Sequence, residues 1–167
     1  MAYTIIEGRV VTQPIAATST TQAEDIPLGT IVRAKDPTYG EGEFIYLLGV
    51  ASTTVGSVVT YNPTTYQTTL CAVGGNVPQS VAVAMSANVA GQYGWYQIGG
   101  VAVVAKQATV SLAAGAAVGV LSTGLIAGTA SGKEIEGAVV AAVASAATGR
   151  TTVQVMINRP RKQGRVT

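Results

Sequence analysis

The stretch that decides the fold is residues 91–105, GQYGWYQIGGVAVVA. It holds three of the chain's nine aromatic residues (one Trp, seven Tyr and one Phe) among four glycines, and it ends in small apolar residues. Trp, Tyr and Val favour strands, and a Gly-Gly pair can occupy both positive-φ positions of a tight hairpin turn. We therefore predict two antiparallel strands, 93–98 and 101–107. Because side chains alternate along a strand, Tyr93 and Trp95 should share one face and Tyr96 the other.

The glycines of this stretch do not form a phosphate-binding loop. Their spacing matches neither the dinucleotide fingerprint nor the P-loop, and no Gly-Lys-Ser/Thr follows. Tyr93, Trp95 and Tyr96 could stack on bases or sugars, but no Lys or Arg is interleaved with them. We expect them to pack in the fold or to lie at a protein interface, where Tyr and Trp are favoured.

The rest of the chain also consists of short strand-like segments between turn signals. Residues 57–61 and 65–71 flank Asn62-Pro63-Thr64, which predicts a hairpin. Residues 151–158 alternate with a period of two, so three apolar side chains share one face: Val153, Val155 and Ile157. Segment 137–147 is ambiguous, because its alanines favour a helix while its valines and leading glycine suit a strand. The pattern predicts an all-β fold, a small antiparallel β-barrel or β-sandwich.

We divide the chain into three parts by composition. Residues 1–27 are expected to form an extended N-terminal arm, because the Thr-rich polar run 12–25 lacks any period and is not typical of a packed element. Residues 28–158 are the β domain. Residues 159–167 form a basic C-terminal tail, which either is solvated or contacts an acidic protein surface or nucleic acid.

Composition limits the classes of function. Charged residues make up 11% of the chain and the net charge is +2, which is not the footprint of a specific nucleic-acid-binding protein. The uncharged stretch between Lys106 and Lys133 is long enough to span a membrane. Its Ala, Gly, Ser and Thr content instead favours strands and turns, so we expect no membrane partner. Small side chains each bury little apolar area, so we expect binding partners to supply part of the stability.

Residues suited to catalysis are scarce. The chain has no histidine, which removes Ser-His-Asp and Cys-His catalysis. Cys71 is the single cysteine, so no internal disulfide can form, and we expect it to be a small buried apolar residue. Glu41 and Glu43 lie in a predicted glycine-flanked loop and could point to one side of an extended chain, but neighbours two apart do not supply the opposed carboxyl pair of a glycosidase. The missing histidines do not forbid carboxylate catalysis by a glycoside or peptidoglycan hydrolase, but no opposed carboxyl pair is visible. We predict a protein that is not an enzyme and has no catalytic residue, metal or cofactor.

Four segments carry a resemblance to known proteins: GEGEFIYLLGV (40–50), VGSVVTYN (55–62), VAVAMS (81–86) and QYGWYQIGG (92–100). They resemble small virion structural proteins of tailed bacteriophages, especially capsid decoration, or cement, proteins. No catalytic residues belong to this resemblance.

The resemblance implies a β-rich protein, often an oligomer, that is made in the host cytoplasm and binds the outer surface of the head. There it would contact the major capsid protein and bridge neighbouring capsomers. The candidate contact residues come from the arm, the opening stretch and the tail: Thr12, Gln13, Ile15, Tyr93, Trp95, Arg159, Arg161 and Lys162. Two alternatives stay open: a tail or head-fibre component, or a receptor- or carbohydrate-binding virion module, which predicts that Trp95 is exposed in a groove.

Overall fold

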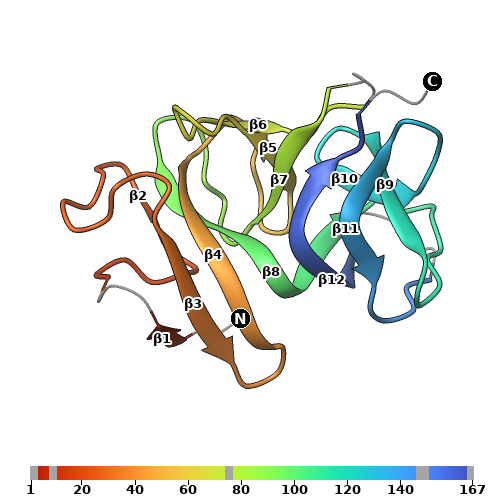
Figure 1. The fold of residues 1–167 in the computed structure, drawn as a ribbon, viewed down its shortest axis with the longest axis horizontal. Helices are drawn as coiled ribbons and strands as arrows, with labels where there is room; N and C mark the ends of the chain where they lie inside the picture. The colour runs from red at the N-terminus through yellow and green to blue at the C-terminus, as the bar shows by residue number, and fades with distance from the viewer. Residues whose placement is uncertain (1–3, 8–10, 74–76, 146–150, 165–167) are drawn as a thin grey trace.

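All regular structure in the described part of the chain is β structure (Figure 1). The computed structural model describes residues 4–7, 11–73, 77–145 and 151–164. These residues form twelve strands joined in one continuous sheet, and all pairs of named strands among them are antiparallel except β8 and β10. The predicted all-β class is confirmed. The strands are β1 (Thr4–Glu7), β2 (Thr18–Ser19), β3 (Ile31–Asp36), β4 (Gly40–Leu48), β5 (Val58–Tyr61), β6 (Thr68–Leu70), β7 (Gln79–Ala84), β8 (Tyr93–Lys106), β9 (Ala117–Ser122), β10 (Leu125–Gly128), β11 (Glu134–Val140) and β12 (Thr151–Lys162).

The opening stretch forms one long bent strand, β8, so the predicted hairpin at Gly99-Gly100 is wrong. The first half of β8 pairs with β4 and the second half pairs with β12. Gly100 has a φ of +90°, and Figure 1 shows β8 bending as it passes from one partner to the other. The glycine pair bends the chain without reversing it, because the ladder with β12 continues across both glycines.

The second half of β8 closes a small barrel. The ring runs β8–β10–β9–β11–β12 and back to β8. Its interior is filled by aliphatic side chains that include Val104, Val140 and Val155. Val153, Val155 and Ile157 are all buried there, which confirms the predicted shared face of residues 151–158.

The first half of β8 belongs to a sheet with a core on each face. Phe44 and Tyr46 of β4 point to one cluster, and Ile45 and Leu47 point to the other. Trp95 joins the first cluster and Tyr96 the second, as the alternation predicted. The predicted hairpin of residues 57–71 is present as β5 and β6, which pair antiparallel.

Residues 11–27 pack against this sheet, so the expectation that 12–25 is an unpacked arm is wrong. Ile15 and Ile26 are buried in the cluster with Trp95, and β2 pairs with the start of β8. The Gln13 side chain accepts a hydrogen bond from the Tyr46 hydroxyl at 2.6 Å. The Trp95 indole N–H donates to the Gln13 carbonyl at 3.0 Å. Two isoleucines and one glutamine are enough to hold a segment whose polar composition suggested solvation.

The boundary placed at residue 158 is also wrong. Strand β12 continues to Lys162, so residues 159–162 belong to the strand, and Arg161 and Lys162 pair with β11 and β7. Residues 165–167 of the predicted tail lie outside the described residues. In the ambiguous segment 137–147, residues 137–140 are strand β11, and 146–147 lie outside the described residues.

Candidate protein-binding surface

Four of the eight predicted contact residues are buried, so they are not free to touch a partner. They are Gln13, Ile15, Trp95 and Lys162. Trp95 has no exposed surface, and the Lys162 ammonium donates a hydrogen bond to the Ala72 carbonyl at 2.9 Å. The types of these side chains suggested contact with a partner, but tertiary packing buries all four. They hold the N-terminal segment and the end of β12 in place.

The other four predicted contact residues reach the surface in three places: the N-terminal segment, β8 and β12. Thr12 lies in the N-terminal segment, where its backbone N–H and its hydroxyl each bond an Asp25 carboxylate oxygen at 3.1 Å. The half-buried Tyr93 stacks near Tyr46 at a centroid distance of 6.4 Å. Arg159 and Arg161 are exposed on β12. Arg161 pairs with Glu136 on β11.

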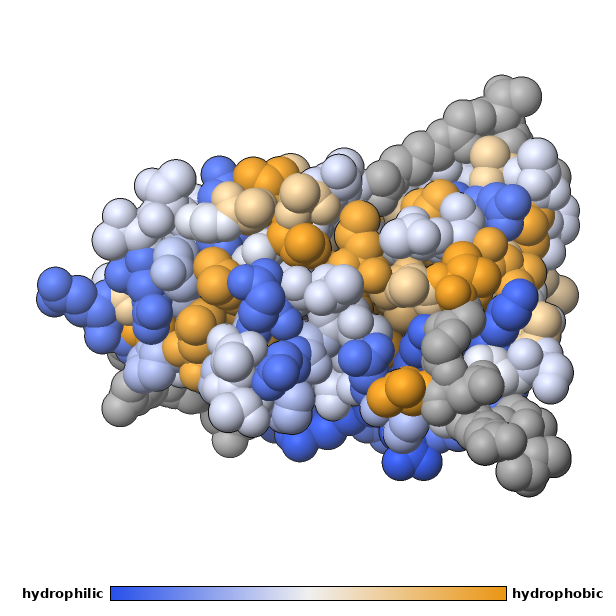
Figure 2. Space-filling view, turned by 90° about the horizontal axis from the view of Figure 1, so that it is seen from above, coloured by the Kyte–Doolittle hydropathy of each residue, from blue (hydrophilic) through white to orange (hydrophobic). Residues whose placement is uncertain are grey.

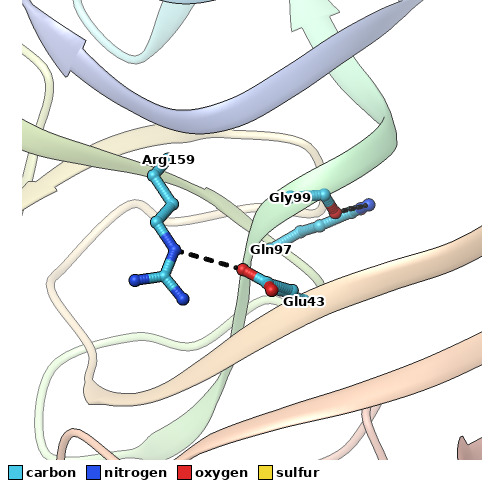
Figure 3. Close-up of polar contacts among 4 residues, drawn as sticks. All are labelled: Glu43, Gln97, Gly99 and Arg159. Atoms are coloured by element: carbon cyan, nitrogen blue, oxygen red, sulfur yellow. Dashed lines mark hydrogen bonds and ion pairs between the residues drawn. The ribbon is translucent and has the colours of Figure 1, made fainter.

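Arg159 lines a groove where β3, β4, β8 and β12 come together. The groove encloses about 420 Å³ and is lined in part by Arg33, Glu43, Gly99 and Met156. The Arg159 side chain donates to a Glu43 carboxylate oxygen at 3.2 Å (Figure 3). These residues lie 116 positions apart in sequence. Their pairing depends on the bend of β8, so no local pattern in the sequence indicated it.

The backbone at Arg159 is in an unusual conformation. Its φ is +43°, in the left-handed region that side chains with a Cβ seldom adopt. On the neighbouring strand, Gly137 has a φ of +76°, and a Cβ there would lie 2.7 Å from the Asn158 carbonyl oxygen. The β11–β12 register shifts beside Gly137. This β-bulge re-aims the side chain of Arg159, which is a common use of bulges beside functional sites.

Beside this groove, three apolar side chains form a row on the outer face of the barrel. Val139 of β11 lies opposite Met156 of β12, which lies opposite Val101 of β8. Val139 is 43% exposed and Met156 is 49% exposed, while Val101 is half-buried. We call this row, together with Arg159, the β12 face. Met156 belongs to both the row and the groove, so the apolar and charged parts are continuous.

Apolar side chains reach the surface elsewhere as well. Figure 2 shows one side of the molecule, on which apolar patches are interspersed among hydrophilic side chains. Scattered exposed valines are normal in folded proteins. The β12 face differs because its apolar residues are register partners on three adjacent strands and adjoin an ion pair.

Gln97 holds the bend of β8 from inside. Its side-chain amide donates to the Gly99 carbonyl at 3.0 Å (Figure 3). The same amide donates to the Val101 carbonyl at 3.1 Å, on the other side of Gly100. The residue is fully buried. Because Val101 belongs to the β12 face, Gln97 positions one member of that face through the backbone.

Burial raises the pKa of three ionisable side chains in the interior. Burial raises the pKa of the Cys71 thiol to about 11, and the nearby positive charge of Lys162 opposes this only in part. Burial also raises the pKa of Tyr46 and of Tyr96. Cys71 has no exposed surface, which confirms its predicted role as a small buried apolar residue. A thiol of this kind is protonated at neutral pH and is a poor nucleophile.

Across residues 4–7, 11–73, 77–145 and 151–164, no three or more Asp, Glu or Cys side chains gather in a way that could hold a metal ion. The same residues include no helix of the length and apolar content needed to cross a membrane. No protein-family model, curated protein or solved structure matches the chain.

Proposed function

We propose that this protein is a capsid decoration protein that binds the outer surface of a tailed-phage head. It acts without catalysis, by burying surface against the major capsid protein and bridging neighbouring capsomers. Each copy adds binding free energy to the assembled shell. Repetition over a symmetric lattice multiplies modest contacts, and we propose that a homo-oligomer adds to this avidity.

The arrangement of the four segments that carry the resemblance supports this proposal. They contain β4, β5, β7 and β8. In the sheet, β4 pairs with β8, β8 with β7, and β7 with β5. The likeness therefore falls on four adjoining strands, which form a single structural unit.

The observation that carries the proposal is the composition of the β12 face. Met156 and Val139 present exposed apolar area, and Arg159 and Glu43 lie at the edge of that area. Met and Arg are enriched at protein interfaces, whose centres are apolar and whose rims are polar. An exposed row of apolar residues across three strands gains free energy when a protein surface covers it, at roughly 25 cal/mol per Å².

The test is binding of purified protein to phage heads that lack it, measured by co-sedimentation and by cryo-EM occupancy. Met156→Glu places a charge in the centre of the β12 face, and we expect it to weaken head binding by about tenfold or more. Val89→Glu is the matched control, because Val89 is 38% exposed and lies in the loop before β8. Equal binding by the two variants would place the contact elsewhere, and a wild-type protein that does not bind heads would refute the function.

The structure does not support the carbohydrate-binding alternative as it was based on Trp95. It required Trp95 to be exposed in a groove, whereas Trp95 is completely buried between the N-terminal segment and the sheet. A role in the tail or in a head fibre remains the second candidate, and copy number in the particle distinguishes it from decoration.

A further inference from the structure

A second groove, distant in sequence from Trp95, has the chemistry of a ligand site. It lies beside the β5–β6 hairpin and the start of β7 and encloses about 460 Å³. This volume falls within the range of roughly 300–1,000 Å³ that is typical of small-molecule sites. From its lining we propose that this groove binds a neutral saccharide. The inference is independent of capsid binding by the β12 face.

The lining of the groove is polar and carries no charge. Its side chains are hydroxyls, amides, two prolines and one tyrosine, among them Tyr61, Asn62, Gln67, Gln79 and Ser80. Hydroxyl and amide groups can donate and accept hydrogen bonds, as the hydroxyls of a sugar also do. A phosphate or carboxylate ligand would lose its hydration here without gaining an opposite charge.

Tyr61 supplies an aromatic surface to the groove. It is half-buried, packs against the cluster that contains Tyr96 and also lines the groove. The face of an aromatic ring is electron-rich, and it can contact the C–H side of a sugar ring, whose hydrogens carry partial positive charge. The structure assigns no hydrogen bond within its described residues to the Tyr61 hydroxyl, the Gln79 amide or the Ser80 hydroxyl.

Hydrogen bonds within the chain fix the wall of the groove. The Asn62 side-chain oxygen accepts hydrogen bonds from the backbone N–H groups of Thr64 and Thr65 at 2.8 and 3.1 Å. The Gln67 amide donates to the Gly49 carbonyl at 2.8 Å, which ties the turn to the chain beyond β4. A fixed wall reduces the ordering entropy that a ligand must overcome, which matters for weak saccharide binding.

The experiment is a screen of the full chain on an array of neutral and sialylated glycans. The best neutral glycan is then titrated by NMR with amide shift mapping. We expect shifts to cluster in residues 60–69 and 78–80. Tyr61→Leu keeps apolar packing but removes the aromatic ring, and should weaken binding by about tenfold or more. Tyr39→Leu is the matched control, because Tyr39 is a partly exposed tyrosine outside the groove. This variant should bind the glycan as the wild type does.

Ser80→Ala provides a second variant if Tyr61→Leu unfolds, since it removes one hydroxyl from the lining and little packing. It should weaken binding several-fold with an unchanged melting temperature. Three results would overturn the inference: no neutral glycan bound at millimolar concentration, shifts that map outside the groove, or equal weakening by Tyr39→Leu. Binding of an extended peptide in place of every glycan would also overturn it. None of these results bears on head binding by the β12 face.

Discussion

Gly100 is the residue on which the bend of β8 depends. Its φ is +90°, and a Cβ there would lie 2.4 Å from the carbonyl oxygen of Glu41. Gly91 also has a positive φ, +75°, but a Cβ there would meet nothing within 4 Å. Substituting each glycine by alanine therefore distinguishes two free-energy costs. One is the positive φ, which both positions have, and the other is the close approach of β4, which only Gly100 has.

We predict that Gly100→Ala lowers the free energy of unfolding by about 2–4 kcal/mol, because both costs apply. Gly91→Ala should lose only about 1 kcal/mol, the cost of the positive φ. Urea denaturation of the two variants beside the wild type measures the difference. Equal losses would mean that β4 does not need to pass so close to the bend.

A substitution at Arg159 can separate the effect of backbone strain on stability from the effect of the side chain on head binding. Its left-handed backbone costs about 1–2 kcal/mol, and its exposed ion pair with Glu43 contributes about 0–1 kcal/mol. Because Asn tolerates this conformation, we predict that Arg159→Asn leaves stability unchanged or slightly raised while it weakens head binding. Arg161→Asn is the control for stability, since Asn is disfavoured in a strand. Thermal denaturation compares the stability of the two variants. An equal loss of stability in both would contradict a strained backbone at Arg159.

Cys71 makes stability depend on alkaline pH. Its pKa is about 11 when folded and 9.0 ordinarily, so the unfolded state releases this proton first as pH rises. The stability due to the protonated thiol is therefore complete below about pH 9 and is lost as pH rises toward about 11. Tyr46 and Tyr96 act in the same direction at higher pH, because burial raises each pKa above 10.0.

We predict a fall in the unfolding free energy of the wild type between pH 8.5 and pH 10 that is smaller in Cys71→Ala. Urea denaturation at several pH values measures it. The native thiol should also react with a thiol reagent at pH 8 only as fast as the protein unfolds. Rapid stoichiometric labelling of the native protein would contradict its burial.

Among the elements, the N-terminal segment depends most on one side chain. Gln13 accepts from the buried Tyr46 hydroxyl and donates to the carbonyls of Ala17 and Tyr93, each at 3.0 Å. Its loss leaves a buried hydroxyl without a partner. Deletion of residues 1–27 would remove Ile15 and Ile26, uncover Trp95 and unfold much of the sheet, so a point variant is the sharper probe.

We predict that Gln13→Ala costs about 1–3 kcal/mol and speeds hydrogen exchange in residues 11–28 more than in the barrel. Gln22→Ala is the control, because Gln22 is exposed and donates one long bond of 3.3 Å. Exchange mass spectrometry resolves the two regions. An unchanged exchange rate in Gln13→Ala would show that the isoleucines alone hold the segment.

Strand positions were predictable because they depend on local alternation and on β-forming side chains, as β5, β6 and β12 show. The bend of β8 was not predictable, since Gly99-Gly100 carries the same local signal as a hairpin. What decides against a hairpin is the pairing of β8 with β12, some 50 residues later in the chain. Likewise, the charges of residues 159–162 suggested solvation, but Pro160 and Lys162 alternate inward as strand residues.

At the scale of the whole molecule, β8 joins two units that share one continuous sheet. One is the closed barrel that carries the β12 face, and the other is the two-faced sheet that the N-terminal segment covers. The candidate surface arises where the units meet, at the groove that β4 and β12 line on either side of the bend in β8. Its residues come from distant parts of the sequence, so sequence reasoning found Arg159 by its charge and missed Met156, Val139 and Glu43 as partners.

The most direct test of the proposed function is the copy number of this chain in purified particles of a tailed phage whose genome is found to encode it. Quantitative mass spectrometry against the major capsid protein gives it, and a cryo-EM map gives the position. A decoration protein should be present in on the order of hundreds of copies on the outer shell. About a dozen copies or fewer at a vertex or tail, or none in the particle, would contradict the account.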